Sequence, residues 1–245
     1  GAGILIQGAS PTLEKVTVSG SSGKGISITG AASNVQLIGA TISGNLGGGI
    51  SIDGGTAQVS GSTISGNTGY GIRVASGSPV VTSTWVNATV AGAAGSGDGV
   101  ELLGGSASFS LYTTSNNEGS GVRVSGGVGH RIQNGLIMGN ASGLVSSIPA
   151  SQVNARFNNW DSPLGPSGSG FGSGQSVSGG AFFDPWLTAS PNSNQYYRDT
   201  AIVGPRFNPL LGVARWDLTS ILAGTWTLKV RDASQIVVRT LVASG

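Results

Sequence analysis

Short runs of alternating apolar and polar residues recur through residue 145, and Gly, Ser and Asn residues separate them. Alternation with a period of two is typical of β-strands with one buried face, and no window has the period of an amphipathic helix. In one repeat, for example, such runs cover residues 26–28, 35–37 and 40–42. The pattern therefore predicts an all-β protein with two or three short strands in each repeat.

The repeats have a nearly constant length. Each contains a glycine followed by an alternating apolar pair, and successive glycines are 22, 24, 22, 28, 22 and 22 residues apart; they are Gly3, Gly25, Gly49, Gly71, Gly99, Gly121 and Gly143. A period of this length is typical of a solenoid, and the Leu-x-x-Leu-x-Leu frame of a leucine-rich repeat is absent. Crossovers between parallel strands favour the right hand. We therefore predict a right-handed parallel β-helix of about seven coils.

Alternation assigns side chains to the two faces of each strand. The residues predicted to fill the bore are Ile26, Ile28, Ile50, Ile52, Ile72, Val74, Val100, Leu102, Val122 and Val124. Three asparagines, Asn45, Asn67 and Asn117, each precede their repeat glycine by four residues. An amide stacked at a turn satisfies backbone polar groups and tolerates a left-handed backbone, so we predict a structural asparagine ladder.

A charged column is predicted on the outer surface. Two residues after the repeat glycine, three successive repeats carry Arg73, Glu101 and Arg123, which would lie about 4.8 Å apart on adjacent strands. One role is a salt-bridged face, in which each exposed pair contributes less than about 1 kcal/mol. The alternative is a groove for an anionic glycan, with arginines bound to carboxylates and Trp85 as an aromatic contact for the sugar.

The longest step, from Gly71 to Gly99, places its surplus residues in 87–98, a Gly/Ala/Ser-rich stretch that predicts a flexible loop.

Candidate catalytic groups are few. Glycoside hydrolysis generally needs two carboxyl groups within about 5–9.5 Å, and only Asp98 and Glu101 lie near each other before residue 158. The lone histidine, His130, has no carboxylate close to it in sequence. We therefore predict no catalytic residue and regard an enzymatic function as the weaker alternative.

Composition narrows the choice of partners. Charged residues make up 9% of the chain, glycines number 44, and the net charge is +2, which does not suggest nucleic-acid binding. The absence of cysteine excludes disulfides and thiolate metal sites, and we predict no metal or cofactor.

No apolar run reaches transmembrane length and no signal peptide is evident. Residues 1–7 start in mid-repeat without a cap, so we expect a processed or trimmed product with an open strand edge.

The segment after the last repeat resembles a known family. Residues 157–168 (FNNWDSPLGPSG) and 182–187 (FFDPWL) resemble the closing segment of the polymorphic right-handed β-helix family, the pectate-lyase-like solenoids of bacterial surface proteins. The resemblance implies a β-helix domain over residues 1–187, which Trp160 and Trp186 would close as apolar plates. This family includes adhesins, structural proteins, lyases, hydrolases and epimerases, so the resemblance leaves the activity open.

The last part of the chain has a different pattern. Residues 206–209, 213–218, 224–232 and 235–242 alternate as strands with turns between them. The run GTWTLKVRD at 224–232 resembles the immunoglobulin-like modules appended to secreted bacterial proteins. We therefore predict a small β-sandwich-like domain over residues 188–245. A sandwich with so few strands is suited to accept a strand from another chain.

These patterns together predict an extracellular or cell-surface protein. We expect a structural or adhesive role, with self-association end to end or by strand exchange, or with surface glycans as the partner. Two alternatives stay open, a polysaccharide-active enzyme of lyase, hydrolase or epimerase type and a carbohydrate-binding solenoid. Carboxylates that converge in one groove would favour the enzyme, and an aromatic row along one face would favour the binding module.

Overall fold

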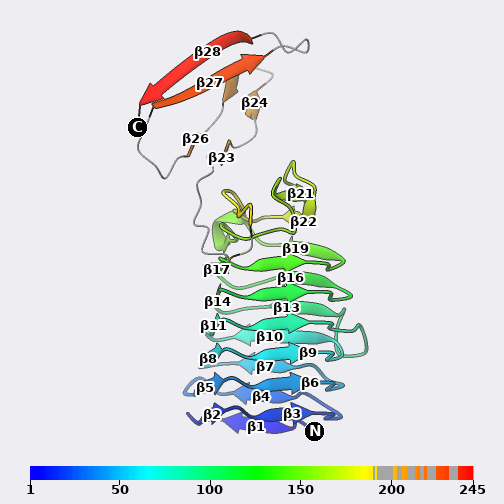
Figure 1. The fold of residues 1–245 in the computed structure, drawn as a ribbon. Helices are drawn as coiled ribbons and strands as arrows, with labels where there is room; N and C mark the ends of the chain where they lie inside the picture. Colours follow the sequence, from blue (N-terminus) through cyan, green and yellow to red (C-terminus); the bar gives the residue numbers. More distant parts are fainter. Residues whose placement is uncertain are drawn as a thin grey trace. The chain divides into compact units, whose positions relative to one another are not determined.

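The computed structural model describes residues 1–189 and 191 and, beyond them, the backbone of six strands between residues 201 and 244. The backbone divides into two units, residues 1–194 and 195–245. In the first unit the chain winds into a parallel β-solenoid of about seven coils, whose strands form three sheets. Figure 1 shows these coils stacked in sequence order from β1 upward. The predicted all-β solenoid is thus confirmed.

Each of the first six coils contributes one strand to each sheet, named A, B and C here, and the strands of this unit after the sixth coil extend only sheets A and B. Sheet A contains, in spatial order, β1 (Ile4–Gln7), β4 (Ile26–Thr29), β7 (Ile50–Asp53), β10 (Tyr70–Ser76), β13 (Asp98–Leu102), β16 (Ser120–Val124), β19 (Ser142–Ser146), β22 (Gly174–Gly179) and β21 (Pro166–Gly168). Sheet B contains β2 (Thr12–Glu14), β5 (Asn34–Ile38), β8 (Thr56–Ser60), β11 (Val80–Thr82), β14 (Ser108–Ser110), β17 (His130–Gln133) and β20 (Val153–Asn154). Sheet C contains β3 (Thr17–Ser19), β6 (Thr41–Ser43), β9 (Thr63–Ser65), β12 (Trp85–Asn87), β15 (Thr113–Ser115) and β18 (Leu136–Met138).

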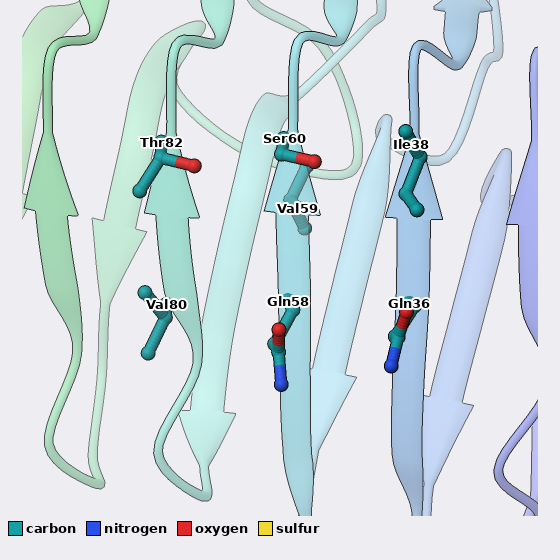
Figure 2. A pocket seen from close by; sticks show the side chains of 7 residues that line it. All are labelled: Gln36, Ile38, Gln58, Val59, Ser60, Val80 and Thr82. Atoms are coloured by element: carbon teal, nitrogen blue, oxygen red, sulfur yellow. The ribbon is translucent and has the colours of Figure 1, made fainter.

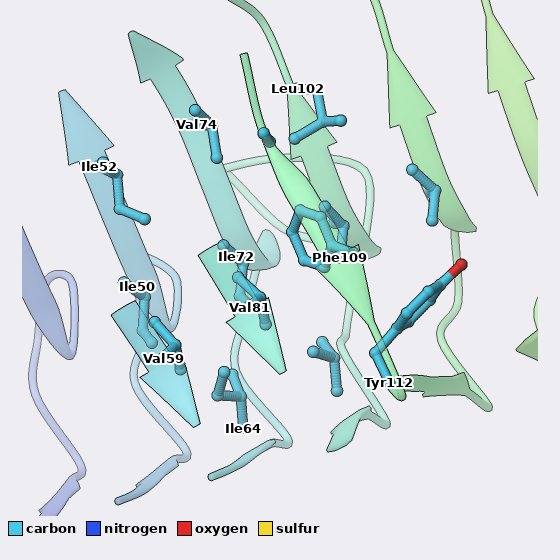
Figure 3. Packing of buried hydrophobic residues seen from close by; sticks show 14 of the residues in the cluster. Ile50, Ile52, Val59, Ile64, Ile72, Val74, Val81, Leu102, Phe109 and Tyr112 are labelled. Atoms are coloured by element: carbon cyan, nitrogen blue, oxygen red, sulfur yellow. The ribbon is translucent and has the colours of Figure 1, made fainter. Parts of the chain in front are cut away.

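The pairing between coils is parallel and in register. Ile26 and Ile28 of β4 pair with Ile50 and Ile52 of β7, and the same columns continue through β10, β13 and β16. All ten residues predicted to fill the bore are at most 1% exposed. Figure 3 shows Ile50, Ile52, Ile72 and Val74 of this set packed in the bore with Val59 of sheet B and Ile64 of sheet C. The predicted inward face of these strands is therefore confirmed.

The repeat glycine is explained by lack of space at one corner of the bore. A Cβ atom on Gly25 would lie 2.6 Å from Ile42 Cγ2, 2.7 Å from Asn45 Nδ2 and 2.9 Å from the carbonyl oxygen of Gly49. The last of these is backbone of the next coil, which cannot move without breaking the register. Any larger residue would push apart two paired strands, so the glycine is needed for close approach.

The surplus residues of the fourth coil lie in the connection between β12 and β13. This loop covers residues 88–97, and Asp98 is the first residue of β13 and fully buried. The loop is folded against its own coil, because Gly69 N–H donates to the Val90 carbonyl at 2.6 Å and Gly97 N–H to the Gly69 carbonyl at 2.8 Å. The surplus thus lies within the predicted stretch, and the flexibility of this loop stays a prediction.

The solenoid continues past its last regular coil. After the one-turn 3-10 helix η1 (Ala150–Gln152), β20 pairs with β17, and β22 extends sheet A beside β19. Trp160 is fully buried within the hydrophobic core, and Trp186 is partly buried against it. Both tryptophans therefore pack with the core, and their role in closing the bore stays a prediction.

The second unit is described by its strands alone. β23 (Ala201–Ile202) pairs with β26 (Leu218–Thr219), β24 (Arg206–Asn208) with β25 (Val213–Arg215), and β27 (Thr225–Arg231) with β28 (Val237–Ser244), all antiparallel. Antiparallel strands agree with the alternation in this part of the sequence. The immunoglobulin-like sandwich and the boundary after residue 187 stay predictions. Among the described residues, no helix is long and apolar enough to cross a membrane.

The packing of the bore makes a direct prediction about stability. We expect Leu37→Ala, at a residue that is 0% exposed, to lower the free energy of unfolding by about 2–5 kcal/mol, because it leaves a cavity between rigid coils. Leu46→Ala removes the same atoms from a residue that is 61% exposed and should change it by less than about 0.5 kcal/mol. Urea unfolding followed by circular dichroism measures both, and equal losses would contradict the assigned faces.

Candidate functional site

The predicted charged column lies on sheet A, with Arg73 on β10, Glu101 on β13 and Arg123 on β16. The three residues are in register on successive strands, as expected. Their side chains do not form one alternating row, however. Arg73 Nε donates to Glu101 Oε2 at 2.6 Å, whereas Arg123 bonds to Asp98. The column therefore consists of two separate ion pairs.

The inserted loop covers the first pair. Arg73 Nη2 donates to the Ala94 carbonyl at 2.8 Å, and the guanidinium carbon lies 3.8 Å from the centroid of the Tyr70 ring. Glu101 lies on the outer side of the strand, as predicted, but it is only 5% exposed rather than at the surface. The arginine thus has three partners within the protein: a carboxylate, a carbonyl oxygen and an aromatic face.

The second pair is centred on a buried carboxylate. Arg123 Nε donates to Asp98 Oδ2 at 2.6 Å and Nη2 to Oδ1 at 3.1 Å, and Ser120 N–H donates to Oδ1 at 2.5 Å. Ser96 Oγ also donates to this carboxylate. Burial raises the pKa of Asp98, but these hydrogen bonds outweigh it and hold the pKa below its ordinary value. Asp98 was assigned no role from sequence, since the period alone cannot locate the surplus residues within a longer repeat.

Trp85 lies on another face of the solenoid. It belongs to β12 of sheet C, whereas the arginines belong to sheet A. The structure therefore does not bring Trp85 together with Arg73, Glu101 and Arg123 into one groove. The residue is 47% exposed, and its Nε1 donates to Ser115 Oγ on the next coil at 2.8 Å.

The asparagine ladder is built from hydrogen bonds between coils. Asn45 Nδ2 donates to Asn67 Oδ1 at 2.9 Å, and Asn67 Nδ2 donates to the Ile42 carbonyl at 3.0 Å. Asn117 Nδ2 donates to Oδ1 of Asn140 at 2.7 Å. Asn140 was not predicted as a member, although it too precedes its repeat glycine by a few residues.

His130 is a buried part of the wall. The backbone N–H of Ala107 donates to His130 Nδ1 at 3.2 Å, and Nε2 lies 2.9 Å from the Gly126 carbonyl. This arrangement fits a neutral imidazole protonated at Nε2. Burial lowers the pKa of His130, and the bond to the Gly126 carbonyl opposes this only in part. The histidine therefore holds a turn in place.

A shallow groove crosses the outer face of sheet B. Its volume is about 190 Å³. Figure 2 shows two rows of side chains along it, with Gln36 beside Gln58 on neighbouring strands; the lining residues are Gln36, Ile38, Gln58, Val59, Ser60, Val80 and Thr82. Amide, hydroxyl and aliphatic groups of this kind suit an uncharged ligand. Among the described residues, three or more His, Asp or Glu side chains do not gather anywhere in a set that could hold a metal ion.

Comparison with known families supports the architecture. Residues 1–95 match the family model of the right handed beta helix region. The solenoid is a right-handed parallel β-helix. Comparison of the chain with curated proteins and with solved structures gives no match. The family match therefore bears on the fold of the coils, and the function has to be argued from their surfaces.

The asparagine ladder predicts a specific loss of stability. Asn67→Ala removes the acceptor for both the backbone N–H and the side-chain amide of Asn45, and these buried donors cannot reach water. We expect the free energy of unfolding to fall by about 1–3 kcal/mol. Asn34→Ala, which removes one exposed hydrogen bond from Thr56, is the matched control. If the two variants unfold at the same urea concentration, the ladder does not stabilise the stack.

The lowered pKa of Asp98 predicts acid sensitivity. An unfolded aspartate has a pKa of about 3.9, so the stabilisation from Asp98 is complete above that pH and is lost as pH falls through the lower folded pKa. We expect Asp98→Asn to lower stability near neutral pH and to make the free energy of unfolding less dependent on pH below about pH 4. Chemical unfolding at a series of pH values measures this. Asp53→Asn, at an exposed residue, should leave the dependence close to that of the unmodified chain.

Proposed function

We propose that this chain is an extracellular or cell-surface protein with a structural or adhesive role, in which the β-helix acts as a stiff rod. The observation that carries the proposal is that its polar side chains bond mainly to the adjacent coil. The Asn45–Asn67 amide bond and the Arg73–Glu101 ion pair both join one coil to the next. Satisfied polar networks of this kind rigidify the structure that contains them.

The burial of the acidic side chains favours this role over catalysis. Asp98 and Glu101, the two acids that lie near each other in the sequence before residue 158, are 0% and 5% exposed. Each accepts an ion pair from an arginine, at 2.6 Å in both cases. A general acid or a nucleophile has to reach the glycosidic bond of a polymer, and neither carboxylate is open to one.

The resemblance of residues 157–187 to the closing segment of pectate-lyase-like surface solenoids also supports a location outside the cell. Self-association belongs to the proposal, either end to end or by exchange of a strand from residues 188–245. Negative-stain electron microscopy and sedimentation velocity of the purified full chain, over a range of concentrations, test it. We expect rods that assemble as concentration rises. Monomers at every concentration would contradict self-association.

A turnover assay separates the structural role from the enzymatic alternative. The full chain is incubated with neutral and with uronate polysaccharides, and new reducing ends and unsaturated products are measured. We expect neither to increase above the rate without protein, because Asp98 and Glu101 are buried in ion pairs. Release of products that is lost in Glu101→Gln would overturn the proposed function.

A further inference from the structure

The outer face of sheet C carries two straight rows of hydroxyl groups. Thr17, Thr41 and Thr63 are in register on β3, β6 and β9, and Trp85 of β12 continues their row. A second row, two residues further along the same strands, consists of Ser19, Ser43 and Ser65. Hydroxyls within a row are about 4.8 Å apart, and the two rows are about 6.6 Å apart. The face is therefore a small rectangular array.

The protein itself makes no use of these hydroxyls. All six residues are exposed or half-buried, and none has a side-chain hydrogen bond to any residue that the structure describes. This differs from the polar side chains of sheet A, such as Arg73, which have partners in the wall. Each hydroxyl can both donate and accept a hydrogen bond. The array thus offers unsatisfied donors and acceptors at regular intervals.

Trp85 adds an aromatic platform to the same face. Its backbone pairs with Thr113 on β15, but its Nε1 reaches Ser115, two residues further along that strand. The indole therefore reaches across to the neighbouring strand, beside Ser115, which is 2% exposed, while Trp85 itself is 47% exposed. The hydrogen bond holds the ring in this orientation, so little side-chain entropy remains to be lost when a ligand stacks on it.

We propose that the outer face of sheet C binds a neutral polysaccharide chain. One pyranose ring stacks on the indole of Trp85, and the chain runs along the solenoid axis over Thr63 and Thr41, whose hydroxyls bond to those of the sugars. A sugar ring combines an apolar C–H face with equatorial hydroxyls, which is the combination that this surface presents. The inference rests on the proposed adhesive role and names the chemical class of its partner.

The charges of the faces favour a neutral ligand over an anionic one. None of the residues in the six strands of sheet C is charged, so a uronate chain would find no cation there. The arginines that could attract carboxylates lie on sheet A and are bonded to Glu101 and Asp98. The groove on sheet B has hydroxyls and amides but no aromatic ring in its lining. Sheet C therefore has the better chemistry for a sugar.

Binding of the full chain to insoluble and soluble neutral polysaccharides, such as cellulose, chitin, xylan and mixed-linkage glucan, tests the inference. Depletion assays and affinity gels measure it, with polygalacturonate as the anionic comparison. We expect Trp85→Ala to weaken binding at least about tenfold, because stacking on an aromatic ring is lost. Thr63→Val, which removes one hydroxyl and keeps the shape, should weaken binding by a smaller factor. Binding should change little with salt, since no charges are involved.

Two variants control for general adsorption. Phe171→Ala removes another exposed aromatic ring, 91% exposed, and Thr82→Val makes the Thr63→Val change in the sheet B groove. We expect both to bind as the unmodified chain does, and thermal unfolding checks that all variants fold. The inference is overturned if no neutral polysaccharide binds, if only polygalacturonate binds, or if Trp85→Ala binds normally. Cleavage of a bound glycan would instead contradict the proposed non-catalytic role. Loss of glycan binding in Trp85→Ala would still support the site.

Discussion

The in-register pairing of each strand with its counterpart in the next coil is the constraint on which the rest of this structure depends. Each residue of a strand lies beside the equivalent residue of the next coil, one repeat later in the sequence. Similar side chains therefore have to pack against one another along the solenoid axis. Isoleucine columns in the bore satisfy this by close packing. Amides satisfy it differently, because an asparagine both donates and accepts. This explains why Asn45 and Asn67 can be fully buried without leaving polar groups unpaired.

The same register explains what an insertion can do. Extra residues cannot enter a strand without shifting every pair beyond it, so the surplus of the fourth coil leaves the wall between β12 and β13. The loop then packs beside sheet A, and the charged groups under it must be paired. Arg73 bonds to the Ala94 carbonyl of the loop and to Glu101 beneath it. The ion pair is thus part of how the insertion is accommodated, which accounts for charged residues in a chain that has few.

Repetition determines how far the sequence predicts this protein. Inward and outward faces follow from a period of two, and axial neighbours follow from the repeat length, so both can be assigned from the sequence alone. The ion-pair partner of Arg123 could not be predicted in this way. Alternation places Glu101 beside Arg123, but Arg123 binds Asp98 at the start of the strand that carries Glu101, and the Ser120 N–H holds Asp98 within reach of the guanidinium. The position of Trp85 relative to the arginines depended on which strands share a sheet. The Thr-x-Ser phrase at 17–19, 41–43 and 63–65 was visible in the sequence, but its residues point outward and the fold does not require them.

The hydroxyl rows of sheet C are informative because the fold itself does not require these residues. Outward positions of sheet A vary freely, from Leu5 through Ser27 to Arg73, so the coil tolerates many residues wherever the bore is not involved. Threonine on sheet C could still be explained by its preference for strands. Serine is not among the residues enriched in strands, yet Ser19, Ser43 and Ser65 repeat with the same register. These serines end their strands directly before Gly20, Gly44 and Gly66, whose φ is positive, and serine is common beside such turns. The proposed glycan ligand adds a use for hydroxyls that the protein leaves without a partner.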